Sequence, residues 1–327
     1  MSLLIIGARE IRRLLPVSEG IETMERAMRA ASSGDAQVTP RMITPLDGGQ
    51  GYFFLMPGDM GASAMYGAKV VSLQPGNPER GLPVVQGFVS LFDRETGRPV
   101  ALLDGAEITT RRTAAATALA TRELARPDVE RHGIFGNGAL AAAHLEAVAG
   151  VRDIRETLVW GRKYEKARAF AAMQSERTGM AVRAVKEPAE AASCGVVSAV
   201  TNAREPIIKG KWLAAGSHLN LVGAHQAGHR EADSEAVSAA AIYVDSLSAV
   251  LKESGDILIP IGEGRFGEGD IVGELGQVLT GAIPSRCDAR QRTLYKSLGI
   301  VAQDLFAAER VYRRALEGGG GVPADFT

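Results

Sequence analysis

The sequence has few of the residues that mark a disulfide-rich or metal-binding protein. It holds only two cysteines, Cys194 and Cys287, among 327 residues. Two are too few for a disulfide framework, and neither has the spacing of a metal site. Aromatic residues make up 5% of the chain, and its five histidines are scattered along it. We therefore expect ordinary thiols and no bound metal.

Long hydrophobic runs and an excess of charge of one sign are also absent. The longest apolar stretches, such as residues 3–6, are far too short to span a bilayer, and the N-terminus lacks the pattern of a secretory leader. The formal net charge of -1 provides no basic field for nucleic acid or an anionic membrane. We therefore expect a cytoplasmic protein that binds a small molecule, with neither nucleic acid nor a membrane as its partner.

The N-terminal part of the chain predicts a β-rich domain. Residues 3–6 are typical of a strand, and residues 17–31 carry apolar side chains at helical spacing. Short β-type runs separated by turns follow at residues 41–45, 52–56, 66–73, 88–92 and 100–103. This pattern predicts an antiparallel or mixed sheet, which is followed by an alanine-rich helix that ends at Leu124 before Pro127.

The second half alternates short apolar strands with helices, which predicts a parallel sheet. Strands are expected at residues 157–160, 196–200, 218–222 and 241–244, with helices at residues 163–178, 188–192 and 234–239 between them. Residues 262–269 are predicted to form a glycine-rich loop and residues 302–316 a closing helix. The glycines at 318–321 indicate a flexible tail.

Residues 133–141, with the sequence Gly-Ile-Phe-Gly-Asn-Gly-Ala-Leu-Ala, are typical of a strand, a tight turn and a helix start. Gly136 would make the turn, Gly138 would let the backbone approach a pyrophosphate, and the helix that begins at Ala139 would present free N–H groups to it. The motif alone also fits an ordinary strand-to-helix turn.

Gly161-Arg162-Lys163 follows the next predicted strand. An NAD-binding unit usually places an acidic residue there for the ribose hydroxyls. Two cations there suit a 2′-phosphate, because a guanidinium can bind it in two places and an ammonium adds to the field. A solvated Arg-Lys pair is the alternative. We predict NADP as the cofactor, with NAD also possible.

Ordered short motifs occur along nearly the whole chain, and together they are specific. They are Pro40-Arg41, Met56-Pro57, Gly67-Ala68-Lys69-Val70, Gly81-Leu82-Pro83, Asp104 with Ile108-Thr109, Arg112-Thr113-Ala114-Ala115, the glycine turn, Val222-Gly223-Ala224, Gly255-Asp256, and Lys296-Ser297-Leu298-Gly299 with Asp304. In these motifs the chain resembles the ornithine cyclodeaminase and mu-crystallin family. This family includes cyclodeaminases, alanine dehydrogenases and reductases of cyclic imines that carry a 2-carboxylate.

The resemblance implies an α/β protein that forms a homodimer. A substrate-binding and dimerisation domain of the α+β type would comprise residues 1–125 and 301–327. A Rossmann-type dinucleotide-binding domain would comprise residues 126–300. The implied substrate is a small molecule similar to an amino acid.

Arg41, Lys69 and Arg112 match the substrate-contacting cations of the family. A guanidinium can bind a carboxylate through two parallel hydrogen bonds, so Arg41 and Arg112 are the expected clamps. Lys69 is the candidate for proton transfer, because neighbouring guanidinium groups would lower its pKa. It also lies inside an apolar run, where a surface role is less natural.

The remaining candidates follow predicted strands or begin a helix, near the expected cofactor. They are Thr113, Thr201, Asn202, Val222, Gly223, Ala224, Ser297 and Gly299, and plain turn chemistry is the alternative for the smaller ones. His225 stands where cyclodeaminases of the family have an aspartate, and it could donate a proton to the substrate or cofactor. It could also only fill a loop.

Departures from the family pattern favour one activity over the others. Cyclodeaminases carry a glutamate two residues before the Met-Pro pair, where this chain has Phe54, and Val84-Val85 replaces the Ser-His of mu-crystallin. Without the two carboxylates, the site suits hydride transfer better than ammonia loss and ring closure. We predict an NADPH-dependent reductase of pyrroline-2-carboxylate or piperideine-2-carboxylate. The alternatives are ornithine cyclodeamination, an alanine-type or opine-type dehydrogenase, and a catalytically idle ligand-binding protein.

Overall fold

The computed structural model describes residues 2–46, 48 and 50–325, and the chain divides into two compact units. The first unit comprises Met1–Arg112 and Ile300–Thr327, and the second comprises Thr113–Gly299. The division falls inside helix α3 (Gly105–Leu124), whereas the sequence predicts a boundary at the end of this helix. None of the helices in the described part of the chain combines the length and the hydropathy that a membrane crossing needs.

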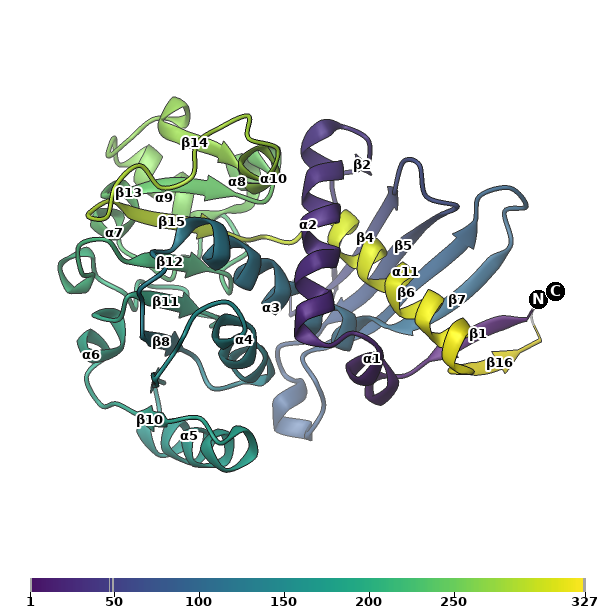
Figure 1. Cartoon of the computed structure of the whole chain (residues 1–327), viewed down its shortest axis with the longest axis horizontal. Coiled ribbons are helices and arrows are strands. Elements are labelled where there is room, and N and C mark those ends of the chain that lie inside the picture. The colour runs from purple at the N-terminus through teal and green to yellow at the C-terminus, as the bar shows by residue number, and fades with distance from the viewer. Residues whose placement is uncertain (1, 47, 49, 326–327) are drawn as a thin grey trace. The chain divides into compact units, whose positions relative to one another are not determined.

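The first unit is the predicted mixed sheet, with helices on one face (Figure 1). Its strand order is β16-β1-β7-β6-β5-β4-β2, with β3 paired to β4, and only the β1–β7 pairing is parallel among the described strands. Helices α2 and α11 pack against each other, and α11 lies on β4, β5 and β6. The elements are β1 (Leu3–Ile6), α1 (Ala8–Leu14), α2 (Val17–Ser33), β2 (Gln37–Val38), β3 (Met42–Leu46), β4 (Gly51–Asp59), β5 (Met65–Leu73), β6 (Val85–Asp93), β7 (Pro99–Asp104), α11 (Val301–Gly318) and β16 (Val322–Ala324).

Two paired glycines let α11 lie close to the sheet. Gly58 of β4 pairs with Gly67 of β5. A Cβ added to Gly58 would lie 2.6 Å from Val301 Cγ1, and one added to Gly67 would lie 3.0 Å from Leu305 Cδ2. Because side chains alternate along a strand, Lys69 lies on the same face of β5 as Gly67. The first turns of α11 therefore lie directly over the region of Lys69.

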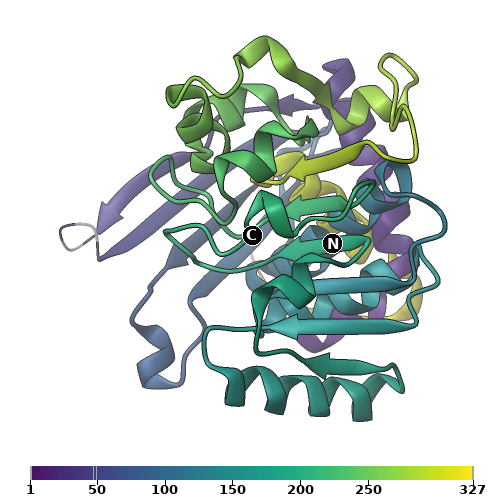
Figure 2. The ribbon, with the colours of Figure 1, turned by 90° about the vertical axis from the view of Figure 1, so that its left-hand side faces the viewer.

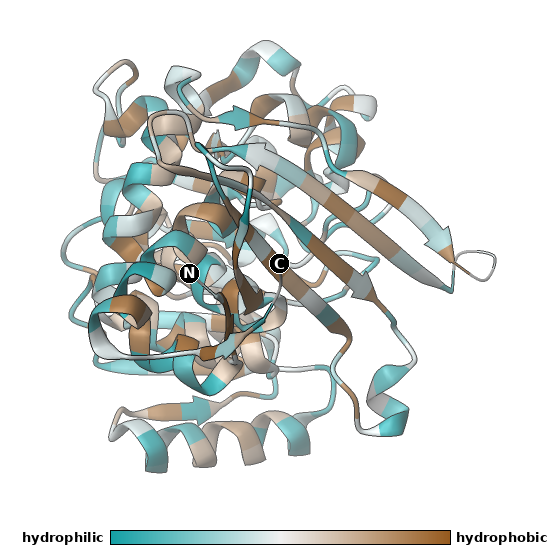
Figure 3. Cartoon of the chain, turned by 90° about the vertical axis from the view of Figure 1, so that its right-hand side faces the viewer, coloured by the Kyte–Doolittle hydropathy of each residue, from teal (hydrophilic) through white to brown (hydrophobic). Residues whose placement is uncertain are grey.

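The opposite face of this sheet carries an exposed apolar row. The strand register aligns Met42, Leu55, Val70 and Phe88 on four neighbouring strands. Met42 is 61% exposed and Phe88 is 42% exposed, although both side chains are large and apolar. Figure 3 shows hydrophobic segments, in brown, on the strands in the foreground. Such a patch is typical of a surface that binds another protein chain.

The second unit is the predicted parallel sheet, with all its strand pairings parallel and the order β10-β9-β8-β11-β12-β15-β13-β14. Helix α5 runs along the β9–β10 edge (Figure 2). The elements are β8 (Arg131–Phe135), α4 (Ala139–Ala149), β9 (Glu156–Trp160), α5 (Tyr164–Thr178), β10 (Val182–Ala184), α6 (Pro188–Ala192), β11 (Val196–Ala199), β12 (His218–Leu221), α7 (Ser234–Ser238), β13 (Ala240–Val244), α8 (Leu247–Glu253), α9 (Gly255–Gly262), β14 (Ile271–Glu274), α10 (Leu275–Leu279) and β15 (Arg292–Lys296).

All five histidines belong to the second unit, and three of them are buried in its interior. Burial lowers the pKa of His132 and His218 to about 3 and that of His144 to about 4, so all three are neutral near pH 7. His144 Nε2 hydrogen-bonds Thr117 Oγ1 at 3.0 Å, and the Asn220 side chain, which bonds His218, donates to Thr121 Oγ1 at 3.1 Å. His144 thus connects α3 to α4, and Asn220, which His218 bonds, connects α3 to β12 of the parallel sheet.

The predicted flexible tail is wrong. Gly319 and Gly321 adopt left-handed φ angles of 67° and 80°, which turn the chain back after α11. The Gly321 N–H donates to the Glu10 carboxylate, and β16 then pairs antiparallel with β1. The glycines therefore form the turn into a strand, because only glycine adopts this conformation without a steric cost.

Candidate active site

Two of the three predicted cations meet at one buried carboxylate of the first unit. Lys69 of β5 donates from Nζ to Asp304 Oδ1 at 3.1 Å, and Arg112 of α3 donates from Nε to the same oxygen at 3.0 Å. The side chains of Lys69 and Arg112 are each 5% exposed, and that of Asp304 is fully buried. Arg112 also donates from Nη1 to Gln303 Oε1, which leaves its Nη2 donors for another acceptor.

The environment of Lys69 lowers the pKa of its ammonium. Burial, the largest cause, lowers the pKa of Lys69 from 10.5 to about 8; Asp304 opposes this change, whereas Arg112 and Arg41 add to it. Arg41 lies between β2 and β3 and is partly buried. The pKa is lowered as predicted, although burial contributes more than the guanidinium groups.

Asp304 is the residue of this cluster to which the sequence assigned no role. It lies in the first turn of α11, where a carboxylate also interacts favourably with the helix dipole. Its second oxygen, Oδ2, is buried and has no hydrogen-bond partner among the described residues. Asp304 contacts Lys69 because α11 lies over β5, and the sequence alone does not reveal which strands this helix covers.

The glycine turn of the second unit has the geometry of a pyrophosphate site. Gly136 has a φ of +119°, and a Cβ added to Gly138 would meet nothing within 4 Å. Gly138 is the N-cap of α4, whose first residue is Ala139; no side chain caps this helix, and its first turn has no acidic residue. Its free N–H groups can therefore bind an anion, and these residues fit a dinucleotide phosphate.

Three cations lie beyond the ends of β9 and β10. The side chains of Arg162 and Lys163 are exposed and form no hydrogen bond or ion pair within the described chain. Lys186, which the sequence did not single out, lies 5.3 Å above the Tyr164 ring, and its carbonyl accepts a hydrogen bond from Trp160 Nε1. Three positive charges therefore lie close to this end of the sheet.

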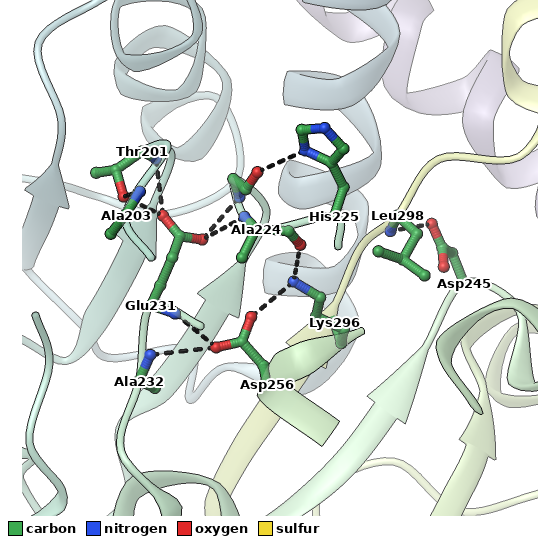
Figure 4. Close-up of polar contacts among 11 residues, drawn as sticks. Thr201, Ala203, Ala224, His225, Glu231, Ala232, Asp245, Asp256, Lys296 and Leu298 are labelled. Carbon is green, nitrogen blue, oxygen red and sulfur yellow. Dashed lines mark hydrogen bonds and ion pairs between the residues drawn. The ribbon is translucent and has the colours of Figure 1, made fainter. Parts of the chain in front are cut away.

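Glu231, also not predicted, joins the loops that follow β11 and β12 (Figure 4). Its Oε1 accepts from the backbone N and the hydroxyl of Thr201, both at 2.7 Å, and its Oε2 accepts from the backbone N of Gly223 and Ala224 at 2.7 and 3.2 Å. Burial and the charge of Asp256 raise the pKa of Glu231. The Thr201 hydroxyl is therefore bound within the protein.

Gly223 is required by a contact between these loops. A Cβ at this position would lie 1.8 Å from the Thr201 carbonyl oxygen. The sequence placed this glycine near the expected cofactor, whereas the protein's own backbone already excludes a side chain here. Val222 and Ala224 are buried on either side of it, and Asn202 is exposed beyond β11. His225 Nδ1 lies 3.0 Å from the Gly223 carbonyl oxygen, which orients the ring.

A buried ion pair supports the same edge of the sheet. Lys296 of β15 donates to the Ala224 carbonyl at 2.6 Å and to Asp256 Oδ2 at 2.8 Å, and both side chains of the ion pair are fully buried. The other Asp256 oxygen accepts from the backbone N of Glu231 and Ala232. Figure 4 shows that Glu231, Asp256 and Lys296 together hold three loops.

Asp245, after β13, binds the segment that follows β15. Its Oδ2 accepts from Ser297 Oγ at 3.4 Å and from the backbone N of Leu298 and Gly299 at 2.8 and 2.6 Å. Gly299 has a left-handed φ of 79°. Thr113, the first residue of the second unit, is buried in α3. Ser297 and Gly299 thus already have partners within their own unit.

Comparison with known proteins identifies relatives over the full chain. The sequence model of the ornithine cyclodeaminase/mu-crystallin family matches residues 3–319. A Delta(1)-pyrroline-2-carboxylate reductase from Bacillus cereus is 35% identical over 327 residues, which cover 99% of this chain and 100% of the relative.

Two solved structures share the fold. The Delta(1)-pyrroline-2-carboxylate reductase of Thermococcus litoralis, in complex with NADH and L-proline, has a TM-score of 0.95 and 38% identity, and the match covers 98% of this chain and 100% of that one. An archaeal alanine dehydrogenase dimer with bound NAD has a TM-score of 0.93 and 31% identity, with full coverage of both chains.

Replacing Lys296 by methionine would leave the buried Asp256 carboxylate without its cation. We expect K296M to lower the free energy of unfolding by about 3–5 kcal/mol, because a buried charge that loses its partner is strongly destabilising. The double variant K296M/D256N should lose less than the sum of the two single variants, since the residues interact directly. Urea denaturation of the four proteins measures this coupling, and additive losses would contradict it.

Proposed function

Because the chain belongs to the ornithine cyclodeaminase/mu-crystallin family, we propose that it is an NAD(P)H-dependent reductase of a cyclic ketimine 2-carboxylate. The substrate would be pyrroline-2-carboxylate or piperideine-2-carboxylate, and the product proline or pipecolate. The observation that carries the proposal is the buried cluster in which Asp304 holds Lys69 and Arg112 together. The relatives that are described as pyrroline-2-carboxylate reductases support it.

The proposed chemistry adds a hydride and a proton across a C=N bond. When bound, NAD(P)H supplies the hydride to the ring carbon that bears the carboxylate. Lys69 would donate the proton that the imine nitrogen gains, because its ammonium is buried and has a pKa of about 8. Arg41 and the Nη2 donors of Arg112 would bind the carboxylate and thereby orient the ring. His225 would act as an additional donor.

The cofactor is proposed to bind at the carboxyl ends of the parallel strands. The turn at Gly136 and Gly138, with the helix start at Ala139, would hold the pyrophosphate. The backbone around Thr201, Asn202, Val222, Gly223 and Ala224, with Thr113, Ser297 and Gly299, would line the nicotinamide side. Arg162 and Lys163 would bind a 2′-phosphate, so NADPH is the preferred form, although the solved relatives contain NADH and NAD.

Imine reduction is tested by mixing the purified protein with each imine and NADPH and following the absorbance of the reduced cofactor. We expect turnover whose kcat/KM falls above about pH 8, because Lys69 must be protonated to act as an acid. The K69M variant should lose about 10²–10⁴-fold in kcat/KM. The exposed Lys166 provides a control, and K166M should retain full activity.

Other outcomes of this assay would identify a different activity. A flat absorbance trace with both imines would rule out the proposed reductase. Ammonia release from ornithine without net cofactor turnover would indicate cyclodeamination. Consumption of reduced cofactor with ammonia and an open-chain keto acid would indicate an alanine-type dehydrogenase. The full activity of K69M would show that another group donates the proton.

The 2′-phosphate preference is tested by replacing Arg162 and Lys163 together by serine. The dissociation constant for NADPH, measured by fluorescence, should rise at least about 100-fold, since two cations are lost and each charge-assisted hydrogen bond contributes about 1.5–3 kcal/mol. The constant for NADH should change less than about twofold. K166S, one helical turn further along α5, is the matched control. Equal changes for both cofactors would exclude 2′-phosphate recognition by this pair.

A homodimer formed through the exposed apolar row of the first unit is also proposed, in line with the alanine dehydrogenase dimer among the relatives. Replacing Phe88 by aspartate places a charge in this row, and the variant should elute with the mass of one chain, 34.5 kDa, in light-scattering chromatography. M173D, at an exposed residue of α5 in the other unit, should remain dimeric. A dimeric F88D would show that another surface forms the contact.

A further inference from the structure

Asp304 has an unusual place among the groups around Lys69. The charged groups that face the ammonium are Asp304 from α11, Arg112 from α3 and Arg41 from the segment between β2 and β3. Asp304 is the anion among these, whereas both arginines and the burial of Lys69 favour the neutral amine. Within the described chain, the charge of this single carboxylate therefore opposes the loss of the Lys69 proton.

The two oxygens of the Asp304 carboxylate have different surroundings. Both cations bind the same oxygen, Oδ1, at 3.0 and 3.1 Å, and Oδ2 contacts no donor of the described residues. Gln303, the preceding residue of α11, binds Arg112 and also donates to Met28 Sδ of α2. The first turn of α11 therefore holds Arg112 by two contacts, and Lys69 by Asp304 alone.

We propose that Asp304 is a positioning residue that keeps Lys69 protonated and aimed for proton transfer, and that it thereby sets the alkaline limit of turnover. This inference rests on the proposed function, in which Lys69 donates a proton to the substrate nitrogen. Asp304 itself exchanges no proton in the reaction. The nitrogen gains the proton that Lys69 loses, and solvent restores it before the next turnover.

The test measures kcat/KM for the imine from pH 6 to 10 in the wild type, D304N and E309Q. Asparagine keeps the shape of the side chain but removes its charge. The alkaline limb of the D304N profile, which is the pH range in which kcat/KM falls, should therefore move to lower pH by about 1–3 units. Glu309 is a buried carboxylate of the same helix whose described partners are Ser63 and Arg313, so the profile of E309Q should match the wild type.

The position of the alkaline limb separates this role from a purely structural one. A structural residue would lower kcat/KM by the same factor at every pH, and a limb set by the substrate nitrogen would not move. Either result for D304N would overturn the proposal. D304E keeps the charge and should keep the limb within about one unit of the wild type. If D304N does not fold, D304S tests the same shift with a smaller neutral side chain.

Thermal unfolding provides a readout that needs no turnover. Asp304 stabilises the folded protein by its attraction to the Lys69 ammonium, and this part is lost as the pH rises through the folded pKa of about 8. The gap in Tm between the wild type and D304N should therefore narrow from about pH 5 to about pH 8, which is the interval between the lowered pKa of Lys69 in the variant and its pKa in the wild type, whereas the gap for E309Q should not. A constant gap for D304N would overturn the coupling. If the imine assay shows no turnover but the Tm gap of D304N narrows, the proposed function is contradicted and the coupling between Asp304 and Lys69 stands.

Discussion

A charge that is removed from water must find a partner within the protein, and this constraint organises both units. In the first unit, Asp304 is fully buried and is compensated by Lys69 and Arg112, which come from a strand and from a different helix. In the second unit, Lys296 compensates Asp256, and Glu231 is satisfied by the backbone donors of two loops. Each carboxylate thus connects segments that lie far apart in the sequence. The candidate site depends on these connections for its geometry.

The elements that could be predicted are those whose pattern is local. The alternation of apolar strands with helices is enough to indicate the parallel sheet, and the glycine turn at Gly136 marks its first crossover. Strand β15 was missed because it begins and ends with Arg292 and Lys296, which obscure its apolar character. β16 was missed because its glycine-rich approach is typical of a disordered tail, and only its pairing with β1 makes it a strand.

The candidate site shows the same division between local and long-range information. Lys69 was predicted because it matches a substrate-contacting cation of the resembling family, and its place inside an apolar run supported that interpretation. Its partner Asp304 follows 235 residues later, and nothing local identifies which strand its helix covers. Glu231 was not predicted at all, since a single glutamate in a loop carries no pattern. The roles of the individual residues in binding and catalysis remain predictions.

Phe54 stands where cyclodeaminases of the resembling family carry a glutamate, so an apolar side chain takes the place of a negative charge near Lys69. Phe54 is 8% exposed and lies two positions from Met56, which pairs with Lys69 across the β4–β5 ladder. Because alternate residues share a face, the Phe54 ring and Lys69 lie on the same face of the sheet, diagonally across two strands. A glutamate at this position, as in the resembling cyclodeaminases, would add a second anion beside Lys69 and hold its proton more tightly. With an aromatic ring there instead, the described residues leave the ammonium with one anion, Asp304, and two guanidinium neighbours. Such a lysine releases its proton more readily, which suits a step that protonates a nitrogen while a hydride arrives. Ring closure with loss of ammonia requires proton removals, and the described surroundings of Lys69 contain no second carboxylate for them.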